Sequence, residues 1–222
     1  MAKKKKQKLN AVSKWFRDLR RAEPFLYRPF FPYKKYGHTE MFKDKAYIFV
    51  GNHLSNLDVV FPAISTNRAV HFMAKSELFD QGVLMKWFVR KCECIPVNRD
   101  GTDVKAVMMA MKYLKMGESV VIFPEGTRNK TDQILLPFRS GATAISIKTK
   151  TPMIPMVQIK PIKLFRKAHV LIGEPIEFTE YYDKRLTEED VKKCDDMLRD
   201  IIYKMYMELT EILSKKKKGK KA

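Results

Sequence analysis

Short apolar runs alternate with helix-forming segments from residue 46 onward, and this alternation limits the possible folds more than any other feature of the chain. The clearest runs are residues 46–50, which are followed by Gly51, and residues 119–123, which are followed by Pro124. Apolar runs of this length are typical of strands buried on both faces of a parallel sheet. The pattern predicts strands at residues 46–50, 70–74, 94–97, 119–123, 153–159 and 168–172.

Helical patterns separate these runs. They predict helices at residues 56–66, 78–91, 102–116 and 139–148, and a long helix opened by a capping box of Thr187 and Asp190. Strands that alternate with helices indicate an α/β fold with a mostly parallel central sheet flanked by helices. In such sheets the ligand site lies at the carboxyl ends of the strands.

The residues before the alternating region are of a different kind. Residues 9–23 have apolar residues at helical spacing, which predicts an amphipathic helix that Pro24 ends. An aromatic and proline-rich stretch follows, and proline at that density argues against a regular helix or a central strand. This segment either contacts a membrane interface or packs on the protein's own core. The predicted organisation is a basic tail at 1–8, a membrane-interface segment at 9–45, an α/β domain at 46–214 and a second basic tail at 215–222.

The charge and the cysteines exclude several classes of protein. Lys and Arg number 44 against 25 Asp and Glu, a net charge of +19, and eleven of the lysines lie in the two tails. This favours an anionic partner, which is nucleic acid, a membrane surface or a phosphorylated substrate. A nucleic-acid-binding module is the alternative from another class, but the chain has no zinc-ligand spacing, RNP-like strand or basic recognition helix, so we expect no specific nucleic acid. Three cysteines make no disulfide framework, and no metal site is expected.

Polar residues follow the first predicted strand in the segment 51–58. His53 and Asp58 are five positions apart across a strand-to-helix turn, so the two side chains can face each other. An aspartate that accepts one ring N–H of a histidine leaves the other nitrogen free to act as a base. The alternative is that His53 only closes the strand and Asp58 caps the helix. No serine or cysteine nearby is an obvious nucleophile, so such a base is expected to act on a hydroxyl group of the substrate.

Residues suited to a phosphate group follow the other strands. Lys75 and Arg99 come after the second and third strands, and the fourth is followed by a turn that contains Glu125, Gly126, Thr127 and Arg128. Glycine allows close approach of a ligand to the backbone, and an arginine fork binds phosphate through two hydrogen bonds. Taken singly, each of these segments is also compatible with an ordinary solvated turn, and Glu125 could form an ion pair with Arg128 instead of a hydrogen bond to substrate hydroxyls.

Taken together and in order, the segments resemble the glycerolipid acyltransferase family, which includes 1-acylglycerol-3-phosphate acyltransferases. The N-H-x-x-x-x-D block is matched by Asn52, His53 and Asp58, and the F-P-E-G-T-R-S block by residues 123–128, with Asn129 in place of the serine. An arginine after a short strand is matched by Arg99, and an apolar, proline-containing block by residues 151–157. The resemblance covers residues 46–160.

The resemblance implies transfer of a fatty acyl chain from acyl-CoA or acyl carrier protein to the sn-2 hydroxyl of lysophosphatidic acid, which gives phosphatidic acid. Glycerol-3-phosphate or another lysophospholipid is the alternative acceptor. His53 would be the general base and Asp58 its orienting partner. Arg99 and Arg128 would hold the phosphate, with Lys75 and then Arg139 as weaker candidates. Glu125, Gly126 and Thr127 would line the glycerol end.

No cofactor beyond the acyl thioester is expected. The lipid substrates, together with the absence of an apolar run of about 20 residues, predict a peripheral, monotopic protein on an anionic membrane surface, at the cytoplasmic face of the cell membrane.

Overall fold

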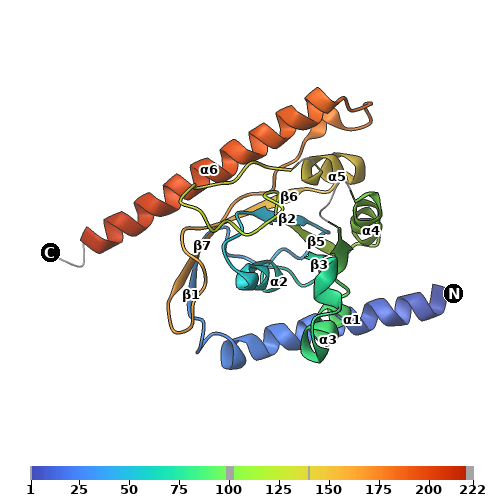
Figure 1. Ribbon diagram of the computed structural model, residues 1–222, viewed down its shortest axis with the longest axis horizontal. Coiled ribbons are helices and arrows are strands. Elements are labelled where there is room, and N and C mark those ends of the chain that lie inside the picture. The colour runs from blue at the N-terminus through green and yellow to red at the C-terminus, as the bar shows by residue number, and fades with distance from the viewer. Residues whose placement is uncertain (1, 99–102, 140, 219–222) are drawn as a thin grey trace.

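A seven-stranded sheet forms the centre of the computed structural model, which describes residues 2–98, 103–139 and 141–218 (Figure 1). The strand order is β1-β7-β6-β2-β5-β3-β4, and every neighbouring pair is parallel except the antiparallel pair of β6 and β7. The strands are β1 Tyr33–Gly37, β2 Ile48–Gly51, β3 Val70–Lys75, β4 Ile95–Val97, β5 Ser119–Ile122, β6 Met153–Gln158 and β7 Ala168–Ile172. The predicted α/β fold with a mostly parallel sheet is confirmed.

Helices cover both faces of the sheet (Figure 1). The alternation of side chains along β2 shows why: Ile48 and Val50 pack toward one face, and Phe49 packs toward the other. The first face is covered by α4 Val104–Lys115, α5 Ala142–Thr149 and α6 Glu188–Lys218, and the second by α1 Ala2–Leu26, α2 Val60–Ala63 and α3 Val83–Lys91. Each strand of the centre is therefore buried on both sides, as its continuous apolar run predicted.

Several helices begin or end elsewhere than predicted, and glycine or proline explains most of the differences. The expected helix at 56–66 consists of the 3₁₀ helix η1 Asn56–Val59 and the short α2, which contains Pro62. The expected helix at 78–91 is divided into η2 Ser76–Phe79 and α3, because Gly82 has a left-handed φ of +61°. A last short 3₁₀ helix, η3 Thr179–Tyr181, precedes α6. The predicted capping box is confirmed, since Thr187 and Asp190 exchange hydrogen bonds of 3.0 and 3.1 Å.

The prediction that Pro24 ends the first helix is wrong. The helix α1 continues to Leu26, and the Glu23 carbonyl accepts the N–H groups of Tyr27 and Arg28 just beyond it, both at 3.0 Å. Proline fixes φ at a helical value, so the last turn of a helix can accommodate it at the loss of one hydrogen bond. The helices α1 and α6 also extend into the lysine-rich ends of the chain, because lysine is a good helix former.

The aromatic and proline-rich stretch contains a strand that the sequence did not predict. Directly after Pro32, β1 pairs with β7 at the edge of the sheet, where its other side needs no partner. The segment before it packs partly on the protein itself, because Phe16 of α1 is 1% exposed and lies in the core below the sheet. Over the part of the chain that the structure describes, none of the helices is long and apolar enough to cross a bilayer.

Candidate active site

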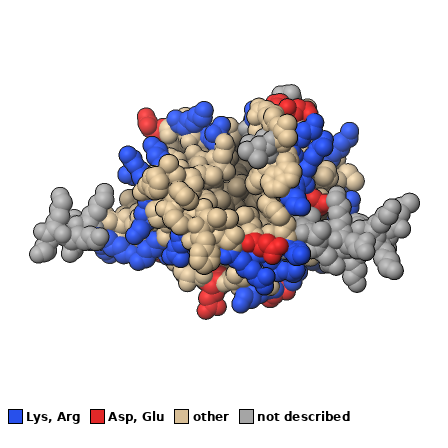
Figure 2. Space-filling view, turned by 90° about the horizontal axis from the view of Figure 1, so that it is seen from below, with Lys and Arg blue, Asp and Glu red and all other residues tan. Residues whose placement is uncertain are grey.

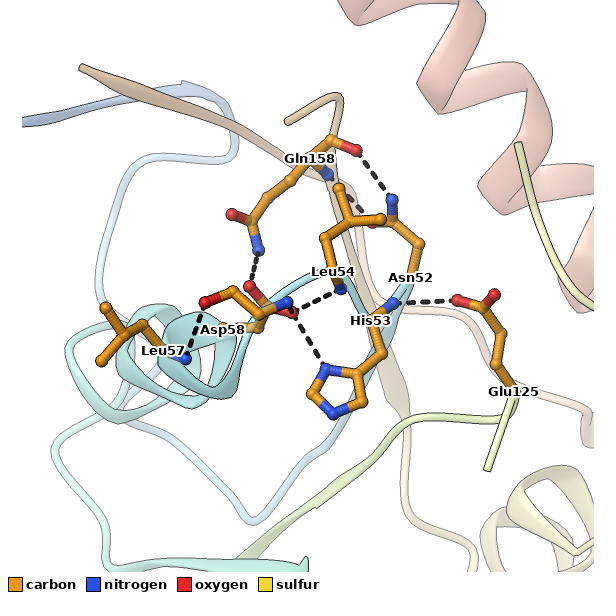
Figure 3. Close-up of polar contacts among 8 residues, drawn as sticks. Asn52, His53, Leu54, Leu57, Asp58, Glu125 and Gln158 are labelled. Carbon is orange, nitrogen blue, oxygen red and sulfur yellow. Dashed lines mark hydrogen bonds and ion pairs between the residues drawn. The ribbon is translucent and has the colours of Figure 1, made fainter. Parts of the chain in front are cut away.

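The turn after β2 is tied to the end of β6 by the buried side chain of Asn52 (Figure 3). The Asn52 amide donates to the Gln158 carbonyl at 2.7 Å, and the Gln158 N–H donates to the Asn52 side-chain oxygen at 3.0 Å. Asn52 is 1% exposed and Gln158 is 4% exposed. The two bonds continue the parallel ladder of β2 and β6 through a side chain, so the residue after Asn52 leaves the sheet at a fixed position.

That residue is His53, and its ring contacts Asp58. The distance from His53 Nδ1 to Asp58 Oδ2 is 2.9 Å, and the ring stacks on Phe123 with centroids 4.1 Å apart and planes inclined by 8°. A carboxylate can only accept, so Nδ1 carries the proton and Nε2 is the unprotonated nitrogen. In Figure 3 the second ring nitrogen points away from Asp58. The predicted pair is therefore formed, in the tautomer that a general base requires.

Asp58 is held by more groups than the histidine alone. Its Oδ2 accepts the backbone N–H groups of Leu54 and Ser55, both at 2.7 Å, and its Oδ1 accepts the Gln158 side-chain amide at 3.1 Å (Figure 3). The Ser55 hydroxyl completes a capping box at the start of η1. The helix-capping role and the histidine-orienting role were alternatives in the sequence, and the structure gives both to the same carboxylate, whose side chain is 1% exposed.

Glu125 fixes the backbone of His53 from the other side. One carboxylate oxygen accepts the His53 N–H at 2.8 Å (Figure 3). The other accepts the Leu136 N–H at 2.8 Å. The His53 carbonyl in turn accepts the Asn129 N–H at 2.7 Å. Burial raises the pKa of Glu125 above its ordinary value, and the two backbone hydrogen bonds oppose that rise only in part. This carboxylate lies behind the histidine, and its predicted contact with substrate stays a prediction.

A cavity of about 430 Å³ opens beside His53. It lies between the carboxyl ends of β3, β4 and β5 and the helices α4 and α5, where a parallel sheet places its ligand site. Cationic side chains and an apolar wall both line it, an arrangement that suits an amphiphile with a charged head. The charged lining residues are Lys75, Asp103 and Arg139, and the apolar ones include Met73, Val97, Val107, Ile122 and Ile145.

Gly126 lies at the cavity wall, and the Arg139 side chain packs directly against its backbone. A Cβ atom on Gly126 would be 2.7 Å from Arg139 Cδ and 2.9 Å from Nε, and the φ of Gly126 is +67°. The backbone of Arg139 is fixed as well, since its N–H donates to the Pro124 carbonyl at 2.8 Å. The absence of a side chain at Gly126 therefore makes room for a cation at the cavity wall, a role that the sequence did not indicate.

The structure brings together most of the predicted site residues. His53, Lys75 and Gly126 line the cavity, together with Arg139, and Asp58 and Glu125 support His53 from behind. Thr127 and Arg128 are exposed and are not among the lining residues. Arg99 lies outside the described residues. Gln158 was not predicted as a site residue, because its only signal in the sequence is a polar residue near the end of an otherwise apolar run.

Comparison with known proteins identifies the family of the chain. The family model described as "Acyltransferase" matches residues 33–159, which include all of β1 to β6. The chain belongs to the acyltransferase family. The matched residues contain the His53–Asp58 pair, Glu125, which binds the His53 backbone, and Gln158, which binds Asp58.

Individual members of the acyltransferase family support the assignment. The chain is 31% identical over 157 residues to a 1-acyl-sn-glycerol-3-phosphate acyltransferase of Bacillus subtilis, covering 67% of this chain and 75% of that one. A chloroplastic enzyme of the same name from Brassica napus is 34% identical over 115 residues, or 51% of this chain and 33% of the relative. The crystal structure of the 1-acyl-sn-glycerophosphate acyltransferase of Thermotoga maritima has the same fold, with a TM-score of 0.64, 22% identity, and coverage of 96% of this chain and 83% of that one.

Proposed function

We propose that this acyltransferase moves a fatty acyl chain from a thioester to the sn-2 hydroxyl of 1-acylglycerol-3-phosphate and so forms phosphatidic acid. The observation that carries the proposal is the His53–Asp58 pair. The His53 ring lines a cavity whose other lining residues include cations and apolar side chains. The relatives in Bacillus and Brassica are named for this acceptor, which supports the choice over other hydroxyl compounds.

The proposed reaction is a direct attack by the acceptor. His53 Nε2 removes the proton of the sn-2 hydroxyl as its oxygen attacks the thioester carbonyl, and the tetrahedral intermediate then expels the thiolate, which takes the proton from the imidazolium. Asp58 stabilises the imidazolium and keeps the ring oriented. None of the described residues that line the cavity is Ser, Thr or Cys, which favours direct attack over an acyl-enzyme.

Cations near the base would bind the acceptor's phosphate. Lys75 and Arg139 line the cavity and are the candidates that its geometry favours. Arg128 and Arg99 remain predicted contributors by resemblance to the family. The acyl donor is proposed to be acyl-CoA or acyl carrier protein, both of which are anions that this basic chain would attract. No resident cofactor is proposed.

Acyl transfer with a panel of acceptors tests the proposal. Purified protein is supplied with acyl-CoA or acyl carrier protein and with lysophosphatidic acid, glycerol-3-phosphate or lysophosphatidylcholine. A kcat/KM for lysophosphatidic acid about tenfold or more above that for each other acceptor is expected. A preference for glycerol-3-phosphate or lysophosphatidylcholine would overturn the assigned acceptor and keep the reaction class, and turnover with none of them would overturn both.

We also propose peripheral attachment to the cytoplasmic face of the cell membrane, because acceptor and product are both membrane lipids. The exposed apolar side chains on α1 support this, since Leu19, Phe25 and Leu26 are 42%, 77% and 71% exposed. Sedimentation with anionic vesicles tests the attachment, and protein that stays entirely in the supernatant would contradict it.

A further inference from the structure

The connection between β6 and β7 ends in a tight turn with an apolar tip. The Arg166 N–H donates to the Lys163 carbonyl at 3.1 Å, and the two residues form an isolated antiparallel bridge. Leu164 and Phe165 are therefore the two central residues of the turn, and they are 53% and 67% exposed. Phe165 has a left-handed φ of +54°, which glycine or asparagine adopts at lower cost. Nothing in the turn itself explains an apolar pair at this position.

The tip meets a second exposed apolar group at the end of α1. The Phe165 N–H donates to the Phe30 carbonyl at 2.6 Å, and the two rings lie 6.0 Å apart. Phe30 is 47% exposed and comes four residues after Leu26. Figure 1 shows the β6–β7 connection reaching down beside this end of α1. We call these five residues the hairpin patch: Phe25, Leu26, Phe30, Leu164 and Phe165.

The two segments that form the hairpin patch carry only positive charge. Residues 24–39 and 159–173 together contain seven Lys or Arg and no Asp or Glu. One of the seven, Lys35, points inward and donates to Ser65 Oγ at 3.2 Å. The other six are exposed: Arg28, Lys34, Lys160, Lys163, Arg166 and Lys167. On the face seen in Figure 2, Lys and Arg surround a centre of other residues, with fewer Asp and Glu among them.

Apolar tips beside exposed cations fit one kind of partner. An anionic bilayer accepts apolar side chains into its interfacial region while its headgroups meet lysine and arginine. Exposed apolar residues on α6, across the sheet, have charged neighbours of both signs. Met207 on α6 is 47% exposed and is followed by the exposed Glu208. The charge around the hairpin patch, rather than its apolar character alone, therefore selects a bilayer.

We propose that the tip of the β6–β7 hairpin inserts into an anionic phospholipid bilayer together with the end of α1. The inference rests on the proposed lipid substrate and adds a contact that is distant in sequence from the N-terminal segment. It also connects the bilayer to the chemistry, since the hairpin begins directly after Gln158, which binds Asn52 and Asp58. Docking through this tip would bring the candidate active site close to the surface in which the acceptor is dissolved.

Vesicle sedimentation of the full chain tests the contact. The double variant Leu164→Asp/Phe165→Asp should bind vesicles of phosphatidylcholine and phosphatidylglycerol about tenfold or more weakly than wild type. Met207→Asp, which places one negative charge at a comparably exposed site on the other face, should bind as wild type does. Both side chains of the pair are exposed, so circular dichroism should show both variants folded. Equal binding by the double variant and wild type would overturn the proposal.

A second pair of variants tests the charge. Lys163→Glu/Arg166→Glu should lose binding to phosphatidylglycerol vesicles, whereas Lys204→Glu on the exposed face of α6 should change binding little. An Asp double variant that abolished a wild-type dimer, seen by analytical ultracentrifugation, would show the patch to be an interface between copies and would overturn the bilayer assignment.

Activity separates this inference from the proposed function. Toward a short-chain, water-soluble lysophosphatidic acid, the double Asp variant should turn over as fast as wild type. No turnover by wild type itself would refute the proposed function alone. Normal turnover with undiminished vesicle binding by the variant would refute the hairpin contact alone.

Discussion

The side-chain amide of Gln158 donates to Asp58 Oδ1 at 3.1 Å, and the two residues are 100 positions apart in the chain. Gln158 ends β6, and Asp58 lies in η1 after β2, the strand beside it. The contact links the carboxylate that orients His53 to the neighbouring strand of the sheet. It makes the geometry of the base depend on the register of β2 and β6, and so on the fold as a whole.

Replacing Gln158 by leucine should lower kcat without affecting substrate binding. The change removes one hydrogen bond from Asp58 and leaves a buried carboxylate oxygen with one partner fewer. This loss should destabilise the folded arrangement around Asp58 by about 1–3 kcal/mol. We expect kcat to fall about tenfold with KM unchanged, because Gln158 does not line the cavity. Steady-state kinetics measures both. A rise in KM at constant kcat would instead place Gln158 at the substrate.

Replacing Gly126 by alanine should weaken binding of the acceptor. The new Cβ would lie 2.7 Å from Arg139 Cδ and would displace that side chain from the cavity wall. Gly82→Ala is a matched control, since its φ of +61° is similar but nothing lies within 4 Å of its Cβ position. Both variants should lose about 1 kcal/mol of stability from backbone strain, and only Gly126→Ala should raise KM for lysophosphatidic acid. Equal KM values in the two variants would contradict the proposed role of Arg139.

The positions of Arg139, Lys75 and Arg128 relative to the cavity predict how much each contributes to binding the acceptor's phosphate. Arg139→Ala and Lys75→Ala remove charges at the cavity wall and should each raise KM for the acceptor about tenfold or more. Arg128→Ala removes an exposed charge that does not line the cavity and should have a smaller effect on KM. Competition by inorganic phosphate should weaken in the first two variants. If Arg128→Ala raised KM more than the other two variants did, the phosphate would bind at Arg128, as the sequence motif alone predicts.

Glu125 should make stability depend on pH in a definite direction. Burial raises its pKa above the ordinary 4.5, so the folded state holds a proton that the unfolded chain has already released. The contribution of Glu125 to stability therefore falls as pH rises from about 4.5 through the raised pKa. Urea unfolding of wild type and Glu125→Gln across this range should show that the free energy of unfolding of the wild type falls relative to that of the variant as pH rises. A constant difference between the two proteins would show that the pKa is not raised.

The parts of this structure that depend on local pattern were predictable from the sequence. Apolar runs fixed the strands of the sheet centre, and the spacing of His53 and Asp58 predicted their contact. The edge strand β1 was not predicted, because three prolines precede it and its pairing with β7 joins segments more than 130 residues apart. The support that Glu125 gives to His53 was not predicted either. Its acidic side chain suggested contact with the substrate, whereas its partners in the structure are the backbone N–H groups of two residues, one of them distant in sequence.

The role of His53 as the base is tested most directly by the rate of acyl transfer to lysophosphatidic acid in His53→Ala, with Asp58→Asn measured beside it. A positioned general base contributes about 10²–10⁴-fold to a rate. We therefore expect kcat to fall by at least about 10²-fold in His53→Ala, with circular dichroism showing the fold intact. Turnover of His53→Ala close to that of wild type would contradict the assignment of His53 as the base.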